Sequence, residues 1–134
     1  MAPPTGRPVP SDPLGILLIS GSHERAHYAF VLATGAAAVG RDVTLFATNQ
    51  GCRALLADWS SLEEAGRDAV IRTQGVAGLE ELRAAAGELG VRLIACDAGL
   101  RMAGLDPANL APGVEIAGVV TFLAAAAGGQ LLSL

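Results

Sequence analysis

The chain has 134 residues, which suits one domain with a hydrophobic core of its own. Its formal charge is −4, and its nine basic residues, all arginine, are scattered along the chain, so we expect no nucleic-acid partner. Its two cysteines form no Cys-x-x-Cys pair, which argues against a disulfide framework or a cysteine zinc site and favours a reducing compartment, the cytoplasm.

The two ends of the chain differ in composition from its middle. Residues 1–13 hold five of the seven prolines and lack the apolar segment of a signal peptide or membrane anchor, so we expect a disordered Pro-rich tail before a single domain over residues 14–134. Residues 116–134 carry no charge, but polar residues and the Gly128-Gly129 pair interrupt them, so we expect no membrane partner. This uncharged surface instead favours association with other copies of the chain.

Short apolar runs alternate with longer periodic stretches along the domain. In chain order, strands are predicted over residues 14–20, 42–48, 91–95, 114–117 and 130–134, and helices over residues 23–39, 51–56, 79–89, 97–103 and through 124–127. Ser22 is the expected N-cap of the first helix, and the polar region 58–75 contains a predicted capping box between Ser61 and Glu64. This alternation predicts an open parallel sheet with helices on both faces, a three-layer α/β/α fold.

Cys96 stands where the predicted strand 91–95 ends and a helix begins. In open parallel sheets, ligands bind outside the carboxyl ends of the strands, where the first turn of the next helix offers unpaired N–H groups. A thiolate, the reactive form of cysteine, is stabilised there, although the carboxylate of Asp97 opposes its formation. Cys96 is therefore a candidate nucleophile; the alternative is a buried thiol that only fills space in the core.

The segment from His23 to His27 matches the H-E-x-x-H pattern of zinc proteases. It opens a helix directly after Ser22, and the chain has no third histidine, so we expect neither a protease nor a metal site. Because this turn opens on the same sheet edge as the Cys96 turn, Ser22 or His23 is instead a candidate to hydrogen-bond or deprotonate the thiol. Ordinary polarity at an exposed helix end is the alternative.

Three stretches of the sequence, LATGAAAVGRDVTLF, GVRLIACDAGLRMAGL and GVEIAGVVTFL, resemble those of the DsrE/DsrF-like family, including its peroxiredoxin-like branch. The resemblance runs from about residue 15 to the C-terminus and is most specific at Ala95-Cys96. It implies a five-stranded parallel α/β/α domain that assembles into trimers or hexamers. It also implies a cysteine that carries sulfane sulfur as a persulfide, and Cys96 matches that cysteine.

The resemblance transfers no role to Cys52. Its position predicts a first-turn helix residue after the second strand, on the same sheet edge as Cys96. If the two strands are neighbours, about 4.8 Å apart, a transient disulfide between the cysteines is geometrically feasible. A packed, inert thiol is the alternative.

Together these patterns predict a small cytoplasmic sulfur carrier or sulfurtransferase-like protein that uses Cys96 as the persulfide-carrying thiol. The supporting candidates are Ser22, His23, Cys52 and Asp97. Sulfur donor and acceptor proteins or small thiols are the expected partners, besides further copies of the chain, and no metal or other cofactor is required. The alternative is a non-catalytic oligomeric binding or scaffold module of the same fold, and a third interpretation is a dithiol redox role for Cys52 with Cys96.

Overall fold

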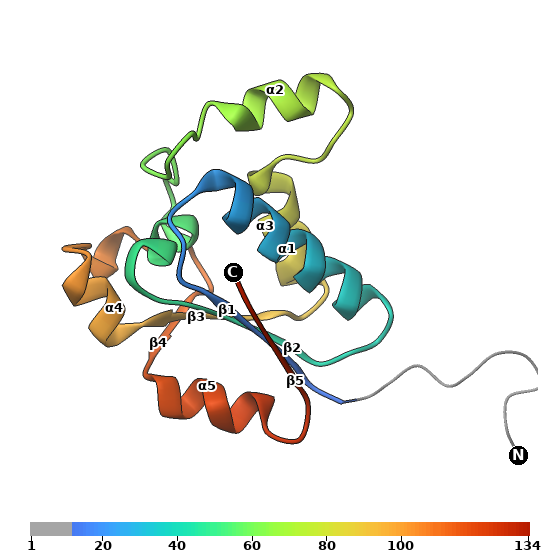
Figure 1. Cartoon of the computed structure of the whole chain (residues 1–134), viewed down its shortest axis with the longest axis vertical. Helices are drawn as coiled ribbons and strands as arrows, with labels where there is room; N and C mark the ends of the chain where they lie inside the picture. The colour runs from blue at the N-terminus through green and yellow to red at the C-terminus, as the bar shows by residue number, and fades with distance from the viewer. Residues whose placement is uncertain (1–11) are drawn as a thin grey trace, which may run out of the picture.

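The computed structural model describes residues 12–134, which fold around one five-stranded sheet (Figure 1). The predicted tail, residues 1–13, lies outside this range except for Asp12 and Pro13. The strands are β1 (Leu14–Leu18), β2 (Val43–Ala47), β3 (Arg92–Cys96), β4 (Glu115–Ala117) and β5 (Gln130–Ser133). All neighbouring strands run parallel in the order β4-β3-β2-β1-β5, which confirms the predicted open parallel sheet.

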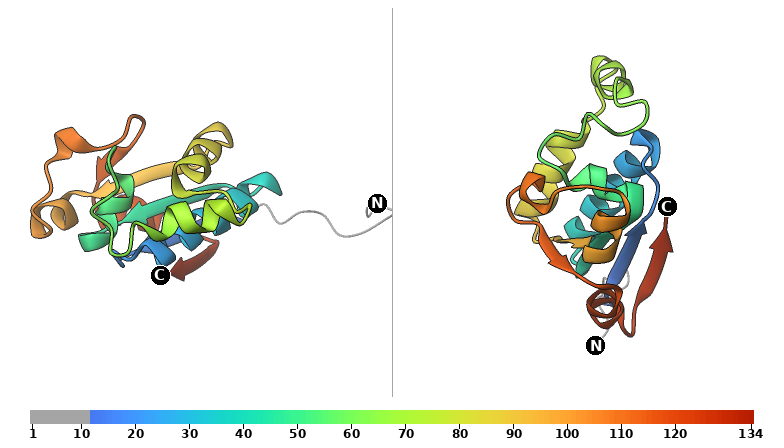
Figure 2. Two further views of the ribbon diagram at one scale, coloured as in Figure 1. Left: turned by 90° about the horizontal axis from the view of Figure 1, so that it is seen from above. Right: turned by 90° about the vertical axis from the view of Figure 1, so that its left-hand side faces the viewer.

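Helices cover both faces of this sheet, as predicted (Figure 2). Helices α1 (His23–Ala38) and α3 (Leu79–Glu88) lie on one face, and α5 (Val119–Ala126) lies on the other. The 3₁₀ helix η1 (Asn49–Leu55) and helix α4 (Asp97–Met102) follow the carboxyl ends of β2 and β3, and the 3₁₀ turn η2 (Pro107–Asn109) precedes β4. Helix α2 (Arg67–Thr73) lies beyond α1 and α3, farthest from the sheet (Figure 1).

The central strand β2 supplies side chains to two separate hydrophobic clusters, because successive side chains of a strand point to opposite faces. The larger cluster lies beneath α1 and α3 and includes Leu45 and Phe30. The smaller one lies on the α5 side and consists of Phe46, Ile94, Cys96 and Phe122. The rings of Phe46 and Phe122 stack with centroids 4.8 Å apart. Cys96 therefore belongs to the face that a single helix covers.

Helix α5 and the edge strand β5 present an exposed apolar surface. Four aliphatic side chains on α5 and β5, which we call the α5 patch, are about half exposed or more: Val119, Val120, Leu123 and Leu131. No charged residue occurs from residue 116 to residue 134. Within residues 12–134, no helix has both the length and the apolar character needed to cross a bilayer. The patch is thus an uncharged apolar surface on a folded domain.

The predicted capping box between Ser61 and Glu64 is wrong. Glu64 adopts a φ of 58°, and α2 begins at Arg67, after Gly66. The cause is a long-range backbone contact: the Glu63 N–H donates to Gly21 O, and Glu63 O accepts from the His23 N–H, both at 2.9 Å. This contact holds the chain against the start of α1 and prevents a helix from starting at residue 62.

Candidate functional site

Cys96 is the last residue of β3 and the N-cap of α4. Its Sγ accepts a hydrogen bond from the backbone N–H of Gly99 at 3.3 Å. The strand places it between β2 and β4, and the residue is 8% exposed. A thiol at this position has one backbone donor on its sulfur and a narrow opening to solvent. This arrangement suits a sulfur atom that must react with a visiting group.

The other side of the Cys96 side chain faces apolar groups. Cys96 packs with Phe46, Ile94 and Phe122, and Leu17 and Ala117 lie against this cluster. Sulfur is polarisable and makes favourable contacts with aromatic rings. The cluster therefore accepts a sulfur atom without hydrogen-bonding to it, and it limits the access of water.

Asp97 forms an ion pair with Arg101. Its Oδ2 accepts from the Arg101 guanidinium at 2.9 Å, one turn along α4, and both side chains are exposed. The guanidinium compensates the carboxylate charge that we expected to oppose thiolate formation. Because both groups are solvated, this ion pair contributes little to stability.

The corner between β2 and η1 is a part of the site that sequence reasoning missed. Ala47 pairs with Ala95, so Thr48 lies level with Cys96, and Asn49 turns the chain with a φ of 53°. Gly99 packs directly against this corner: a Cβ on Gly99 would lie 2.5 Å from Asn49 N and would also clash with Thr48 Oγ1. Two residues in the sequence could have indicated this corner. Asn49 is one, because asparagine tolerates a positive φ, and Gly99, three residues after Cys96, is the other.

Cys52 lies in η1 and is fully buried, with its Sγ directed to Ala47 O at 3.4 Å. Burial raises the pKa of the Cys52 thiol to about 11; the backbone N–H of Cys96 offsets part of this effect, and a charge on Cys96 adds to it. Cys52 follows β2 and Cys96 ends β3, and these two strands are neighbours, as the predicted disulfide requires. The two thiols are free and belong to different clusters, since Cys52 packs with the larger one. The pairing stays a prediction.

A family model for the DsrE/DsrF/DrsH-like family matches residues 56–132, more than half of the chain. The chain belongs to this family. Among curated relatives of this family member, the uncharacterized protein YrkE of Bacillus subtilis is 28% identical over 147 residues, covering 87% of this chain and 92% of the relative. The sulfur carrier protein DsrE2 of Allochromatium vinosum is 27% identical over 141 residues, covering 81% of this chain and 89% of the relative.

Two solved structures share the fold of this family member. The protein of unknown function MTH1491 from Methanobacterium thermoautotrophicum superposes with a TM-score of 0.61 at 19% identity. The ychN protein from E. coli superposes with a TM-score of 0.64 at 16% identity. Each match covers 92% of this chain and 99% of the other chain. At these identities the structures bear on the fold, which they confirm as the three-layer α/β/α arrangement.

The side chains of Ser22 and His23 form their hydrogen bonds near the start of α1 and with α2, not with Cys96. Ser22 is the N-cap, as predicted, and its Oγ accepts from the Arg25 N–H at 3.2 Å. His23 is fully buried, with Nε2 2.7 Å from Asp68 Oδ1 and Nδ1 3.2 Å from the Arg67 guanidinium. A guanidinium only donates, so Nδ1 accepts and Nε2 carries the proton. Both ring nitrogens thus face α2. Helix α1 follows β1, and β2 lies between β1 and β3, the strand that carries Cys96.

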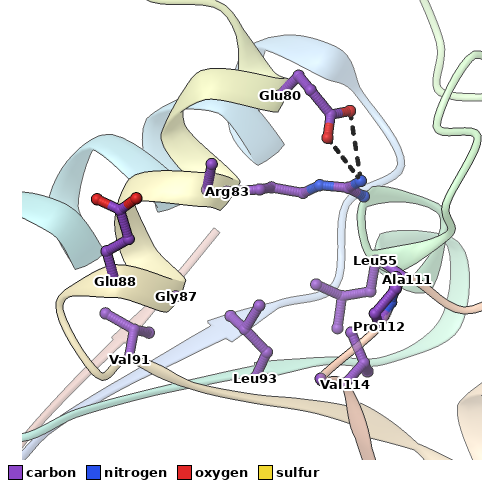
Figure 3. Close-up of a pocket in the computed structure, with 12 residues that line it drawn as sticks. Leu55, Glu80, Arg83, Gly87, Glu88, Val91, Leu93, Ala111, Pro112 and Val114 are labelled. Carbon is purple, nitrogen blue, oxygen red and sulfur yellow. Dashed lines mark hydrogen bonds and ion pairs between the residues drawn. The ribbon is translucent and has the colours of Figure 1, made fainter.

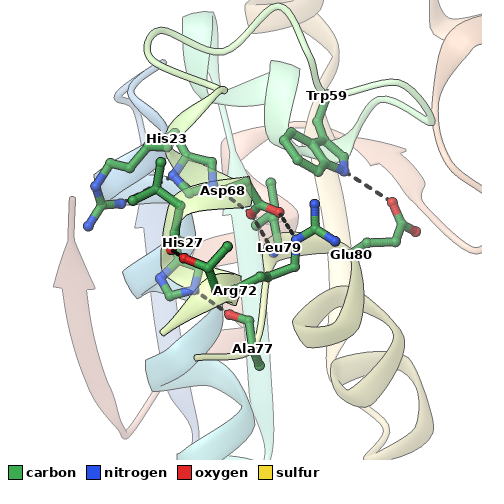
Figure 4. A network of polar contacts seen from close by, with 11 residues as sticks. His23, His27, Trp59, Asp68, Arg72, Ala77, Leu79 and Glu80 are labelled. Carbon is green, nitrogen blue, oxygen red and sulfur yellow. Dashed lines mark hydrogen bonds and ion pairs between the residues drawn. The ribbon is translucent and has the colours of Figure 1, made fainter. Parts of the chain in front are cut away.

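The H-E-x-x-H segment of this family member has a structural role (Figure 4). The His27 Nε2–H donates to Ala77 O at 2.8 Å, and the rings of His23 and His27 stack 5.6 Å apart. Glu24 is exposed and lies 3.8 Å from Arg67. Residues 12–134 contain no group of three or more His, Cys, Asp or Glu side chains placed to hold a metal ion. The histidines instead connect α1 to the segment that carries α2.

A cavity of about 550 Å³ lies between α3, β3 and residues 111–114 (Figure 3). Aliphatic side chains, among them Leu93 and Val114, form its floor, and the buried Arg83 crosses it to donate to Ala54 O at 3.0 Å. Cys96 is not among its lining residues, because its side chain points to the α5 side of the sheet. The cavity is therefore separate from the candidate site.

Proposed function

We propose that this protein is a small cytoplasmic sulfur carrier, or sulfurtransferase-like protein, in which Cys96 holds sulfane sulfur as a persulfide. The observation that carries the proposal is the position of Cys96: the residue ends the inner strand β3, and its sulfur accepts one backbone hydrogen bond and is otherwise surrounded by apolar side chains. Membership in the DsrE/DsrF/DrsH-like family supports it, as does similarity to a relative named as a sulfur carrier.

The proposed chemistry needs two displacements at sulfur. In the first, the Cys96 thiolate attacks the outer sulfur of a donor persulfide, R–S–SH; the donor S–S bond breaks, and its electron pair leaves with R–S⁻. Cys96 then carries –S–SH. In the second, an acceptor thiolate attacks that outer sulfur, the new S–S bond replaces the one to Cys96, and the Cys96 thiolate leaves. Electrons and atoms balance within each step, so the two steps require no metal or other cofactor.

The surroundings of Cys96 fit these steps. The Gly99 N–H donates to the sulfur and stabilises it when it is negatively charged, before attack and again on departure. The apolar cluster around Phe122 keeps bulk water from a bound persulfide. Because Cys96 is 8% exposed, donors and acceptors must present a slender sulfur group at the sheet edge, which small thiols or a cysteine on a flexible segment of a protein can do.

We also propose that the protein assembles with further copies of itself, as a trimer or hexamer. The α5 patch supports this: it is aliphatic, uncharged and exposed, and such surfaces are usually covered in oligomers. The same patch favours the second candidate function, a non-catalytic oligomeric binding or scaffold module whose cysteines are structural. The sulfur carrier requires a reactive Cys96 thiol, whereas the scaffold module does not.

Sulfur loading followed by intact mass distinguishes the two functions. The native protein is incubated with a small-molecule persulfide, and Cys96→Ser and Cys52→Ser are treated alongside. A carrier gains about 32 Da per subunit, the mass of one sulfur, and loses it with dithiothreitol. The gain is expected in wild type and Cys52→Ser and not in Cys96→Ser. Absence of the adduct with several donors, together with slow alkylation of Cys96, would favour the scaffold module.

A further inference from the structure

Gly99 is connected to the Cys96 sulfur through its backbone. It is the third residue of α4, and its N–H, which has no partner inside the helix at that position, donates to Cys96 Sγ at 3.3 Å. We propose that Gly99 is a positioning residue of the sulfur site: its N–H holds the Cys96 sulfur, and the absence of a side chain lets α4 approach close enough for that hydrogen bond. The inference rests on the proposed function of Cys96 and adds the group that orients its sulfur.

The approach of α4 is set by the Thr48–Asn49 corner. A Cβ on Gly99 would lie 2.5 Å from Asn49 N and would also overlap Thr48 Oγ1. Contacts shorter than about 3.0 Å do not occur for real Cβ atoms, so one of the two segments would have to move. Asn49 N belongs to the backbone, and no rotation of a side chain relieves that clash.

The corner itself is firmly held, so a side chain at residue 99 would displace α4. The Thr48 N–H donates to Leu18 O, and the Gly51 N–H donates to Ile19 O, both at 3.0 Å. The Thr48 hydroxyl also donates to Asn49 Oδ1 at 3.0 Å. The first two bonds attach the corner to the end of β1. A shift of α4 away from it would lengthen the Gly99 to Cys96 hydrogen bond.

A matched pair of glycine-to-alanine substitutions tests this inference. Gly99→Ala and Gly87→Ala both place alanine in a helix, but Gly87 in α3 has no heavy atom within 4 Å of the Cβ position. In a Cys52→Ser background, the rate of Cys96 alkylation by iodoacetamide is measured as a function of pH. We expect Gly99→Ala to react about tenfold more slowly near neutral pH, with its pH profile moved upward, because a hydrogen bond to a charged group is lost. Gly87→Ala should match the background.

A backbone ester at Gly99 removes the N–H without adding a side chain, and it keeps the inference testable if Gly99→Ala fails to fold. Because Cys96 itself can serve as the ligation residue, the full chain is assembled from a residue 1–95 thioester and a synthetic segment 96–134. The ester should reproduce the slower alkylation and the moved pH profile relative to the all-amide chain made the same way. Equal rates and profiles for the two ligated proteins would overturn the inference.

Alkylation needs no sulfur donor, so the two proposals fail separately. If the ester slows alkylation but the all-amide chain takes up no sulfur from any donor, the carrier function is lost and the role of Gly99 stands. If the all-amide chain loads sulfur and the ester loads it at the same rate with the same pH profile, Gly99 has no positioning role and the carrier function stands.

Discussion

His23 and Asp68 form a buried contact of 2.7 Å between His23 Nε2 and Asp68 Oδ1, which connects the first turn of α1 to α2. Asp68 Oδ1 also accepts from the Leu79 N–H at 2.8 Å, and Oδ2 lies 3.2 Å from Arg72 Nε. Asp68 is the one buried residue of α2. A single carboxylate therefore fastens α2 to α1 and satisfies the first turn of α3.

Asp68→Ala should lower the free energy of unfolding by about 3 kcal/mol, because it leaves the His23 and Leu79 N–H groups without an acceptor in a buried place. Asp68→Asn should cost less, since its amide oxygen can still accept from both groups. Urea unfolding monitored by circular dichroism measures both changes. An Asp68→Ala protein as stable as wild type would show that water replaces the carboxylate.

The contribution of Asp68 to the free energy of unfolding should depend on pH. Burial alone would raise its pKa, but the hydrogen bonds from Leu79 and His23, with the charge of Arg72, outweigh it and lower the pKa of Asp68 below its usual value of 3.8. A carboxyl with a lowered folded pKa stabilises the protein above the unfolded pKa and loses that stabilisation as the pH falls through the folded value. The stability difference between wild type and Asp68→Asn should thus be constant from pH 7 to about pH 5 and shrink below about pH 4. A difference that grows on acidification would contradict this sign.

The two thiols should differ strongly in reactivity. With a pKa of about 11, Cys52 is ionised to only ~10⁻⁴ at neutral pH and is also fully buried, so native protein should take up one iodoacetamide adduct, at Cys96. Both cysteines should react in urea. Peptide mapping assigns the adduct, and Cys52→Ser should leave its rate unchanged. Equal labelling of both residues in the native state would contradict the buried position of Cys52.

The packing around the two cysteines opposes the transient disulfide expected from the sequence, so mild oxidation should not join them. Cys52 stays protonated and packs with the larger cluster, whereas Cys96 packs with the smaller one, so a disulfide requires both side chains to leave their clusters. We expect the intact mass after treatment with oxidised glutathione, read without reduction, to be that of the reduced chain or of a mixed disulfide between Cys96 and glutathione. A loss of about 2 Da and of both thiols, the change for one disulfide, would establish the dithiol role instead.

The α5 patch should determine self-association. Val120→Arg places a charge on a residue that is 78% exposed in the patch, and Val70→Arg places the same charge on α2, where the residue is 58% exposed. We expect the wild type to sediment as a trimer or hexamer, Val120→Arg to sediment as a monomer, and Val70→Arg to match the wild type. A wild type that sediments as a monomer at high concentration, or identical sedimentation profiles for all three proteins, would contradict the proposed assembly.

The elements of the fold and the position of Cys96 were predictable because both are local. Apolar runs and helical periodicity marked all five strands and helices α1, α3, α4 and α5, and Ser22 caps α1 as expected. Cys96 follows an apolar strand and precedes a helix in the sequence, so its place at a strand end needed no tertiary information. Helix α2 was missed, since its single buried residue leaves no apolar periodicity to detect.

The contacts of the site depended on tertiary structure. The sequence by itself determined that a thiol ends a buried strand of a parallel sheet, because strand and helix patterns are properties of neighbouring residues. Only the packed structure decided that Gly99 lies against Asn49, 50 positions earlier in the chain, and that His23 is directed to Asp68 instead of Cys96. These pairs meet because strand order and helix docking bring distant segments together, and both depend on how side chains fill the space between elements, which no local pattern records.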